Sequence, residues 1–414
     1  MTTVAKRAPT TFDVVGGSTA PGFGGYYADD LLAVQAGADS DGLVYRGAPR
    51  TTGHRHIRNP AQAVLIRLRS SEGHVGWGDA VTVQYSGFAG REPPINPAAL
   101  APQVDAAVNA LSGSGSFSFA EACELVERLR VGDRPLHSGV RYGLSQALLS
   151  LAAAVSKRPP AQIPLDLLGP RRLNPVPIYA QSGEERYRNV DKMILKRVDV
   201  LPHGLINSPE AFGAGGEAVL AYARWVRERI ADLGGETYEP RLHFDVYGLL
   251  GSETNGDVEA MVRICEQLVE VSRPHAVQLE SPILGEDADS TLQALHQLRA
   301  ALTRHDIPLT IVADDWCNTI EDITRFLDAG AADLIQIKTP DLGALTNAIR
   351  AVQACRAAGA AVFIGGSCSE TDVSARASVQ LAVAAGAEQV LAKPGMGVDE
   401  AVAITRNEMQ RVCM

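Results

Sequence analysis

The chain has 414 residues, a formal net charge of −10, and 46% hydrophobic and 21% charged residues. This composition is that of an ordinary globular protein, and the length exceeds one typical domain. Nucleic acid and anionic membrane surfaces both require a concentrated basic face, so the acidic balance argues against either as the main partner. The chain has no apolar run of membrane-spanning length and no secretory signal at its N-terminus, so a cytoplasmic protein is expected. Its six cysteines show no Cys-x-x-Cys spacing, which argues against a disulfide framework or a zinc site.

The first part of the chain, up to about residue 165, combines strand and helix patterns. Residues 63–81 alternate in polarity on both sides of Ser71–Gly73, which predicts a β-hairpin. Helical periodicity follows over residues 98–113, 119–130 and 140–158. Strands followed by helices predict a compact α+β domain.

Between the hairpin and these helices lies the Gly-rich segment VQYSGFAGREPP, residues 83–94. Its composition predicts a loop. Two interpretations stand side by side: a mere connector, or a segment that covers an active site.

From residue 166 onward the pattern changes to strands that alternate with helices. Eight short apolar runs are strand candidates: 176–181, 193–200, 242–248, 276–282, 309–315, 334–340, 361–367 and 389–394. Eight strands and their helices over about 240 residues match the size of a (β/α)8 TIM barrel. A doubly wound open sheet is less favoured, because polar residues end nearly all the strands and no G-x-G-x-x-G follows an early strand.

Three of the strands end on acids, Asp245, Glu280 and Asp314, spaced at about 35 residues, the length of one barrel unit. The carboxyl ends of barrel strands converge on one mouth, where three carboxylates would repel one another without a cation among them. Oxygen ligands with positions left open for substrate suit Mg²⁺. Each acid taken alone is explained as well by capping the following helix, but three in register favour a metal site.

Lys338 and Gln336 lie two residues apart on one strand and therefore share a face. A lysine near a divalent cation is expected to have a depressed pKa and to serve as a base, although a salt bridge to one of the acids is the alternative. His203 falls at the same mouth, which suggests an acid/base or carboxylate-binding role. Cys368 follows two glycines and is interpreted as a pocket-lining donor, because no base is paired with it. A metal beside a lysine base fits removal of a proton alpha to a carboxylate.

At this level of detail the chain resembles the methylaspartate ammonia-lyases of the enolase superfamily. The resemblance covers nearly the whole chain and rests on these motifs: VQYSG with GR-x-P, AQSG, VDVLPHGLIN, HFDVYG, VADDWCNTIED, IQIKTPDLG, GGSCSET and VLAKPGMGVDE. It implies an α/β fold in which an N-terminal α+β capping domain, residues 1–165, covers a modified TIM barrel, residues 166–414.

The same resemblance implies the chemistry of a carbon–nitrogen lyase. Asp245, Glu280 and Asp314 would hold Mg²⁺, and Lys338 would remove the C3 proton of L-threo-3-methylaspartate to give a Mg-stabilised enediolate, then mesaconate and ammonia. His203 would contact the substrate carboxylate and act as the opposite-face base. The remaining implied substrate contacts are Gln181, Gln336, Ser367, Cys368 and, beside the alkyl group, Leu391. A homodimer and activation by a monovalent cation such as K⁺ are also implied.

The chain departs from the family pattern around the pocket. Ser367 stands where Thr is usual, Tyr179 where Phe is expected, Phe363 where Tyr is expected, and Asp315 replaces a Glu. A larger 3-alkylaspartate, such as 3-ethylaspartate, is therefore an alternative substrate. Competing functions are another enolase-superfamily reaction (dipeptide epimerase, cycloisomerase or acid-sugar dehydratase) and a non-catalytic ligand-binding relative.

Overall fold

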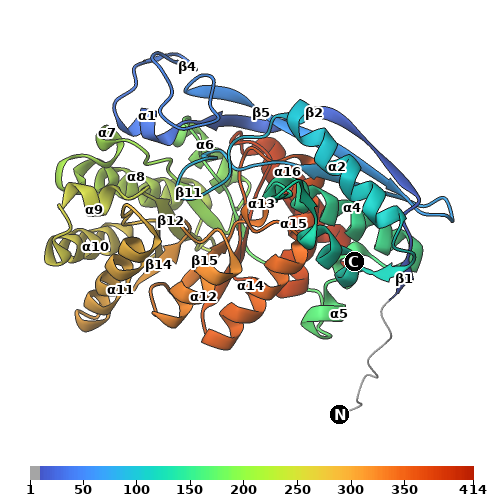
Figure 1. Ribbon diagram of the computed structural model, residues 1–414. Coiled ribbons are helices and arrows are strands. Elements are labelled where there is room, and N and C mark those ends of the chain that lie inside the picture. Colours follow the sequence, from blue (N-terminus) through green and yellow to red (C-terminus); the bar gives the residue numbers. More distant parts are fainter. Residues whose placement is uncertain (1–9) are drawn as a thin grey trace.

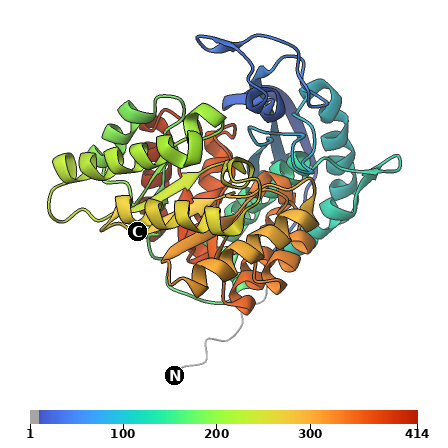
Figure 2. The ribbon, with the colours of Figure 1, turned by 90° about the vertical axis from the view of Figure 1, so that its left-hand side faces the viewer.

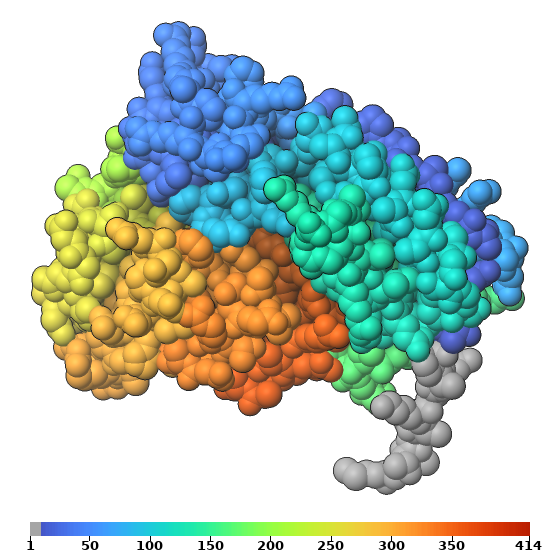
Figure 3. Space-filling view, viewed as in Figure 1, coloured from blue at the N-terminus to red at the C-terminus, as the bar shows by residue number. Residues whose placement is uncertain are grey.

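The computed structural model describes residues 10–414 and shows a closed barrel covered by a smaller N-terminal part (Figure 1). The N-terminal part, blue to cyan, lies against the barrel over an extended contact (Figure 3). Green, yellow and orange helices surround the barrel (Figure 2). Within residues 10–414, no helix is both long enough and apolar enough to cross a membrane.

The barrel consists of eight parallel strands paired in chain order, and its last strand pairs with its first. The strands are β10 (Ile178–Tyr179), β11 (Val200–His203), β12 (Arg241–Asp245), β13 (Val277–Glu280), β14 (Leu309–Ala313), β15 (Leu334–Ile337), β16 (Ala361–Ile364) and β17 (Gln389–Leu391). The helices that follow them are α6 (Arg186–Leu195), α7 (Pro209–Phe212), α8 (Glu217–Gly234), α9 (Leu249–Glu253), α10 (Val258–Ser272), α11 (Ala288–Arg304), α12 (Ile320–Asp328), α13 (Thr339–Leu342), α14 (Leu345–Ala358), α15 (Asp372–Ala385) and α16 (Asp399–Cys413). The predicted TIM-type barrel is confirmed.

One strand lies elsewhere than predicted. Residues 193–195 end helix α6, and the second barrel strand begins only at Val200. Met193 and Ile194 are buried on the inner face of that helix, so their apolar character reflects helix packing and not a strand. The shift places His203 inside β11, at its carboxyl end.

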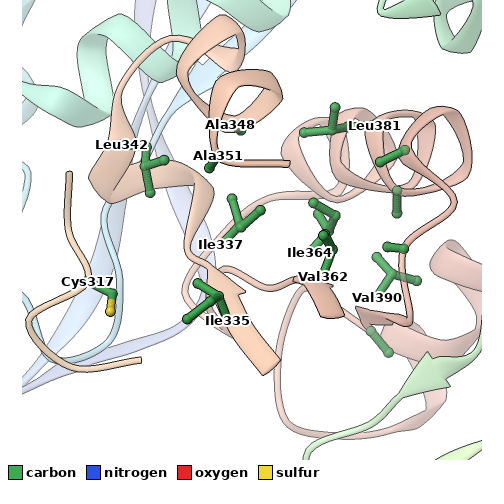
Figure 4. Packing of buried hydrophobic residues seen from close by; sticks show 14 of the residues in the cluster. Cys317, Ile335, Ile337, Leu342, Ala348, Ala351, Val362, Ile364, Leu381 and Val390 are labelled. Atoms are coloured by element: carbon green, nitrogen blue, oxygen red, sulfur yellow. The ribbon is translucent and has the colours of Figure 1, made fainter. Parts of the chain in front are cut away.

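Alternation along β15 decides which side chains face the barrel interior. Ile335 and Ile337 pack outward with Ala348 and Ala351 of α14 (Figure 4). Since successive side chains of a strand point to opposite faces, Gln336 and Lys338 face inward. Packing of the isoleucines against the helices therefore orients Gln336 and Lys338 toward the barrel mouth.

The N-terminal part contains an antiparallel sheet in the order β2-β5-β6 and three long helices. Its elements are β1 (Thr11–Phe12), β2 (Gly16–Asp29), α1 (Leu31–Gln35), β3 (Ser40–Asp41), β4 (Val44–Tyr45), β5 (Arg58–Arg69), β6 (Val75–Ala80), α2 (Pro97–Ser112), β7 (Phe117–Ser118), α3 (Phe119–Arg128), β8 (Arg130–Val131), β9 (Arg134–Pro135), α4 (Ser138–Ser156) and α5 (Leu165–Leu168). The hairpin and the three helices were predicted correctly. The 14-residue strand β2, rich in glycine, was not predicted.

Helix α4 lies directly on β6 because the strand carries glycines at the contact. A Cβ on Gly76 or Gly78 would collide with the backbone of α4. The same helix reaches the barrel, where the hydroxyl of Tyr142 donates to Glu370 at 2.9 Å. Helix α4 therefore joins the cap to the loops at the strand ends.

Candidate active site

The three predicted metal ligands end neighbouring strands of the barrel. Asp245 and Glu280 are paired residues of β12 and β13, and Asp314 directly follows β14. All three side chains are at most 5% exposed. The helices after these strands are capped by other residues, Asp287 and Thr319 among them, so the helix-capping alternative does not apply.

A small cavity of about 30 Å³ lies among the strand ends. Its lining residues are Val83, Gln84, Tyr85, Gln181, Asp245, Tyr247, Glu280, Asp314, Asp315, Gln336, Lys338, Gly366 and Ser367. Seven of the ten predicted site residues are among them. The Gly-rich segment 83–94 supplies three lining residues, so it covers the site and is more than a connector.

Each acid turns toward a polar neighbour in this structure. Glu280 accepts a hydrogen bond of 2.6 Å from His243 Nε2 and another from Gln336. Asp314 contacts Lys338 Nζ at 2.6 Å, while Asp245 lies 3.5 Å from His203 Nε2. Accordingly, no three His, Cys, Asp or Glu side chains of residues 10–414 are gathered as a ready ion-binding group. A cation among the acids would have to replace these contacts.

The electrostatics of the cavity favour a cation. Burial, followed by the charges of Asp245 and Asp314, raises the pKa of Glu280 well above its usual range. Burial also raises the pKa of Asp245, although His203 opposes the shift. Four acids line the cavity, against the positive charges of Lys338 and the adjoining Arg91. Buried carboxylates with excess negative charge fit a hard divalent cation.

Lys338 lies at the cavity on the inner face of β15 and forms the salt bridge that was the alternative to a base role. Burial and the charge of Arg91 lower the pKa of this lysine, but Asp314, Asp315 and Asp341 raise it more, so the net shift is upward. The protein's own charges therefore do not produce the depressed pKa expected from the sequence. A cation beside Asp314 would act in the lowering direction.

His203 faces Lys338 across the barrel, because β11 and β15 are the second and sixth of eight strands. Its Nδ1 accepts the backbone N–H of Leu205 at 3.2 Å, which places a ring proton on Nε2. That Nε2 lies 3.1 Å from the hydroxyl of Tyr247. Gln181 approaches the same nitrogen at 3.4 Å, so the two predicted residues meet at the mouth.

The remaining predicted residues lie on the last two strand ends. Ser367 Oγ accepts the backbone N–H of Gln84 at 2.9 Å, and Cys368 Sγ lies 3.4 Å from Gln84 Oε1. Burial raises the pKa of Cys368 to about 12, in keeping with a donor and not a nucleophile. Leu391 packs deeper in the barrel with Tyr179 and Phe363.

The residues at the site that sequence reasoning missed include Arg91, His243 and Gln84. Arg91 of the covering loop bonds Asp315 at 2.7 Å and Asp341 at 2.9 Å, and also lies 3.3 Å from Asp314. His243, two residues before Asp245 on β12, supports Glu280. The two-residue spacing on a strand was the available signal for His243, whereas the position of Arg91, like that of Gln84, depends on how a distant loop folds.

A large cavity of about 680 Å³ lies elsewhere, against β2 and β5 of the N-terminal part. Arg55 and His56 are its titratable lining residues. It contains neither the acids nor the lysine of the barrel mouth, so volume alone does not identify the site.

Comparison with known proteins agrees with this geometry. Family models described as "Methylaspartate ammonia-lyase N-terminus" and "Methylaspartate ammonia-lyase C-terminus" match residues 14–166 and 171–414. A magnesium complex of β-methylaspartase from Clostridium tetanomorphum has 40% sequence identity and a TM-score of 0.90, covering 97% of this chain and 98% of that one. The Citrobacter amalonaticus methylaspartate ammonia-lyase, solved with (2S,3S)-3-methylaspartic acid, has 38% identity and a TM-score of 0.92, covering 96% and 98%.

A more distant likeness concerns the fold alone. Muconate cycloisomerase from Pseudomonas fluorescens has 19% identity and a TM-score of 0.61, covering 90% of this chain and 84% of that one. The capped barrel is thus the enolase-type fold. With matches that span nearly the whole chain, the protein belongs to the methylaspartate ammonia-lyase family.

Proposed function

We propose that this enzyme eliminates ammonia from L-threo-3-methylaspartate to give mesaconate. The observation that carries the proposal is the opposed pair His203 and Lys338, at the ends of the second and sixth strands, with three buried carboxylates at the ends of the strands between them. A substrate held between these strands meets a titratable group on each face. The relatives named above supply the substrate class.

Lys338 is the base. Its Nζ takes the proton from C3, the C3–H electron pair becomes the C2=C3 double bond, and the C2–N bond breaks to release ammonia. The lysine is positioned by the backbone, because it directly follows β15 and continues the inward face of that strand with Gln336. Proton transfer by a positioned group typically contributes about 10²–10⁴-fold to the rate.

Asp245, Glu280 and Asp314 would hold Mg²⁺. Their burial and mutual charge fit such an ion, as the raised pKa of Glu280 indicates. When bound, the ion supplies positive charge beside the substrate carboxylate, where negative charge develops as C3 loses its proton.

The other predicted residues orient the substrate. His203, with its proton on Nε2, donates a hydrogen bond to the substrate carboxylate. Its place opposite Lys338 also suits the opposite-face base, a role that requires the other tautomer, in which Nε2 carries no proton. Gln181, Gln336, Ser367 and Cys368 surround the rest of the small molecule. Leu391, packed against Tyr179 and Phe363, borders the 3-alkyl group, with methyl preferred and ethyl the alternative.

We also propose, from the family resemblance, a cytoplasmic homodimer activated by K⁺, with the domain boundary between residues 165 and 166. Light scattering after gel filtration tests the dimer. Rates in K⁺ and in Li⁺ at equal ionic strength test the activation, and limited proteolysis tests the boundary.

The decisive assay follows the ultraviolet absorbance of the conjugated product after mixing enzyme, Mg²⁺ and L-threo-3-methylaspartate. Lys338→Ala should abolish the signal, whereas Lys192→Ala, on outer helix α6, should not. Exchange of the C3 hydrogen in D₂O, followed by NMR, reports proton removal separately from C–N cleavage. Exchange without ammonia release would favour an epimerase-type reaction, and neither signal from folded, Mg²⁺-loaded enzyme would refute the proposal.

A further inference from the structure

A second lysine ends a barrel strand, and the chemistry described above does not use it. Lys393 lies two residues beyond β17, and its Nζ is 2.6 Å from Glu370 Oε1. Both side chains have 0% exposure. Neither residue is among those that line the cavity.

The polar atoms of this pair hold the turn formed by residues 365–368. Lys393 Nζ donates to the carbonyl of Gly365 at 2.8 Å, and Glu370 Oε1 accepts the backbone N–H of Ser367 at 2.9 Å. The two charged groups therefore form hydrogen bonds to the backbone on both sides of Gly366. A Cβ on Gly366, whose φ is +123°, would collide with Glu370 Oε1 and with Lys393 Nζ. The backbone thus lies directly on the ion pair.

The turn carries groups that the proposed function assigns to substrate binding. It presents the hydroxyl of Ser367 and the thiol of Cys368, and Gly365 packs so closely on Gln336 that a Cβ would collide with it. A small rotation of the turn would move Ser367 and Cys368 relative to the cavity and would change the contact of Gly365 with Gln336. Positional errors of about 1 Å at such sites reduce rates strongly.

The network also reaches the covering domain and the base. Glu370 Oε2 accepts the hydroxyl of Tyr142, from helix α4, at 2.9 Å. The hydroxyl of Thr339, the residue after Lys338, donates to Tyr142 at 3.2 Å. One buried chain of contacts therefore joins the cap, the turn and the end of β15.

Stability alone does not account for such a pair. Removing two charges from water is costly, and apolar residues of similar volume often replace a buried ion pair without loss of stability. What apolar residues cannot supply is a donor for the carbonyl of Gly365 and an acceptor for the N–H of Ser367. These two backbone contacts determine the orientation of the turn.

We propose that Lys393, Glu370 and Tyr142 form a positioning network that fixes the 365–368 turn and so aims Ser367 and Cys368 at the substrate. The inference rests on the proposed function, because it needs those two residues to contact the substrate. None of the three positioning residues touches the substrate itself.

The test compares wild type with the double variant Lys393→Met/Glu370→Leu, which removes both charges together, and with the milder Tyr142→Phe. Loss of about one hydrogen bond to the substrate predicts a KM about tenfold higher for the double variant, and a smaller rise for Tyr142→Phe. Arg158→Met is the matched control, because it breaks a partly buried ion pair with Asp166 at the far end of α4. That control should leave KM unchanged.

Hydrogen exchange of peptides that contain residues 361–371 is the second readout. The proposal expects faster exchange at the turn in the double variant and in Tyr142→Phe, but not in Arg158→Met. Unchanged KM and unchanged exchange in folded variants overturn it, as does faster exchange with unchanged kcat/KM. If the double variant does not fold, Tyr142→Phe decides by the same two measurements. Absence of turnover by wild type would instead refute the proposed function, while exchange still shows whether the network holds the turn.

Discussion

Replacing Arg91 by methionine should destabilise the enzyme more than any exposed charge change. The guanidinium is 2% exposed and lies within ion-pair distance of Asp314, Asp315 and Asp341, each itself nearly buried. Methionine keeps the aliphatic volume but leaves Asp315 and Asp341 without an ion-pair partner, whereas Asp314 keeps Lys338 at 2.6 Å. Removing one partner of a buried ion pair typically costs about 3–5 kcal/mol.

The expected shift in melting temperature follows from the size of the chain. With an unfolding entropy of about 2.1 cal/mol/K per residue, 414 residues give about 0.9 kcal/mol per °C, so Tm should fall by about 3–6 °C if cap and barrel unfold together. Differential scanning calorimetry measures this. Arg46→Met, which breaks the exposed pair with Asp41, is the control and should shift Tm by less than about 1 °C.

A compensating change sharpens the test. Adding Asp341→Asn to Arg91→Met removes one of the orphaned buried charges and should recover part of the lost Tm. If Arg91→Met shifts Tm no more than Arg46→Met does, or if the added Asn lowers Tm further, the reasoning about the buried cluster is wrong.

Three further predictions concern the metal, the thiol and pH. Calorimetric titration should show Mg²⁺ binding to the wild type. The Mg²⁺ affinity should be about 100-fold or more weaker in Glu280→Gln, and about tenfold weaker in His243→Ala because the imidazole of His243 supports Glu280. Equal affinities in wild type and Glu280→Gln would exclude Glu280 as a ligand. Iodoacetamide at pH 8 should leave Cys368 unmodified by peptide mapping and activity intact, because burial raises the pKa of this thiol to about 12; rapid labelling would contradict this environment. Lys192 and Lys196 lower the pKa of exposed Asp399 to about 2, below its unfolded value, so the stability it contributes is present above about pH 4 and is lost as pH falls toward 2. Urea unfolding should therefore show Asp399→Asn to be slightly less stable than wild type at pH 7, and this difference in stability should shrink in acid. A difference that grows in acid would contradict the prediction.

The sequence by itself determined the barrel and most of the polar side chains at its mouth. Side-chain direction along a strand is a local property, so the run Ile335–Lys338 already shows which residues face inward. The regular spacing of Asp245, Glu280 and Asp314 likewise places them at one end of a closed barrel, because each unit has nearly the same length. The family motifs named the reaction once these positions were recognised.

The tertiary structure decided what depends on contacts between distant segments. Residues 193–195 are equally apolar in a strand or on a packed helix, and only burial in α6 resolved the choice. The glycine-rich strand β2 has little local propensity and exists because β5 pairs with it. Arg91 forms ion pairs with three acids of the barrel, and Lys393 and Glu370 bind the 365–368 turn. Both sets of contacts join parts of the chain that only folding brings together, so no local pattern encodes them.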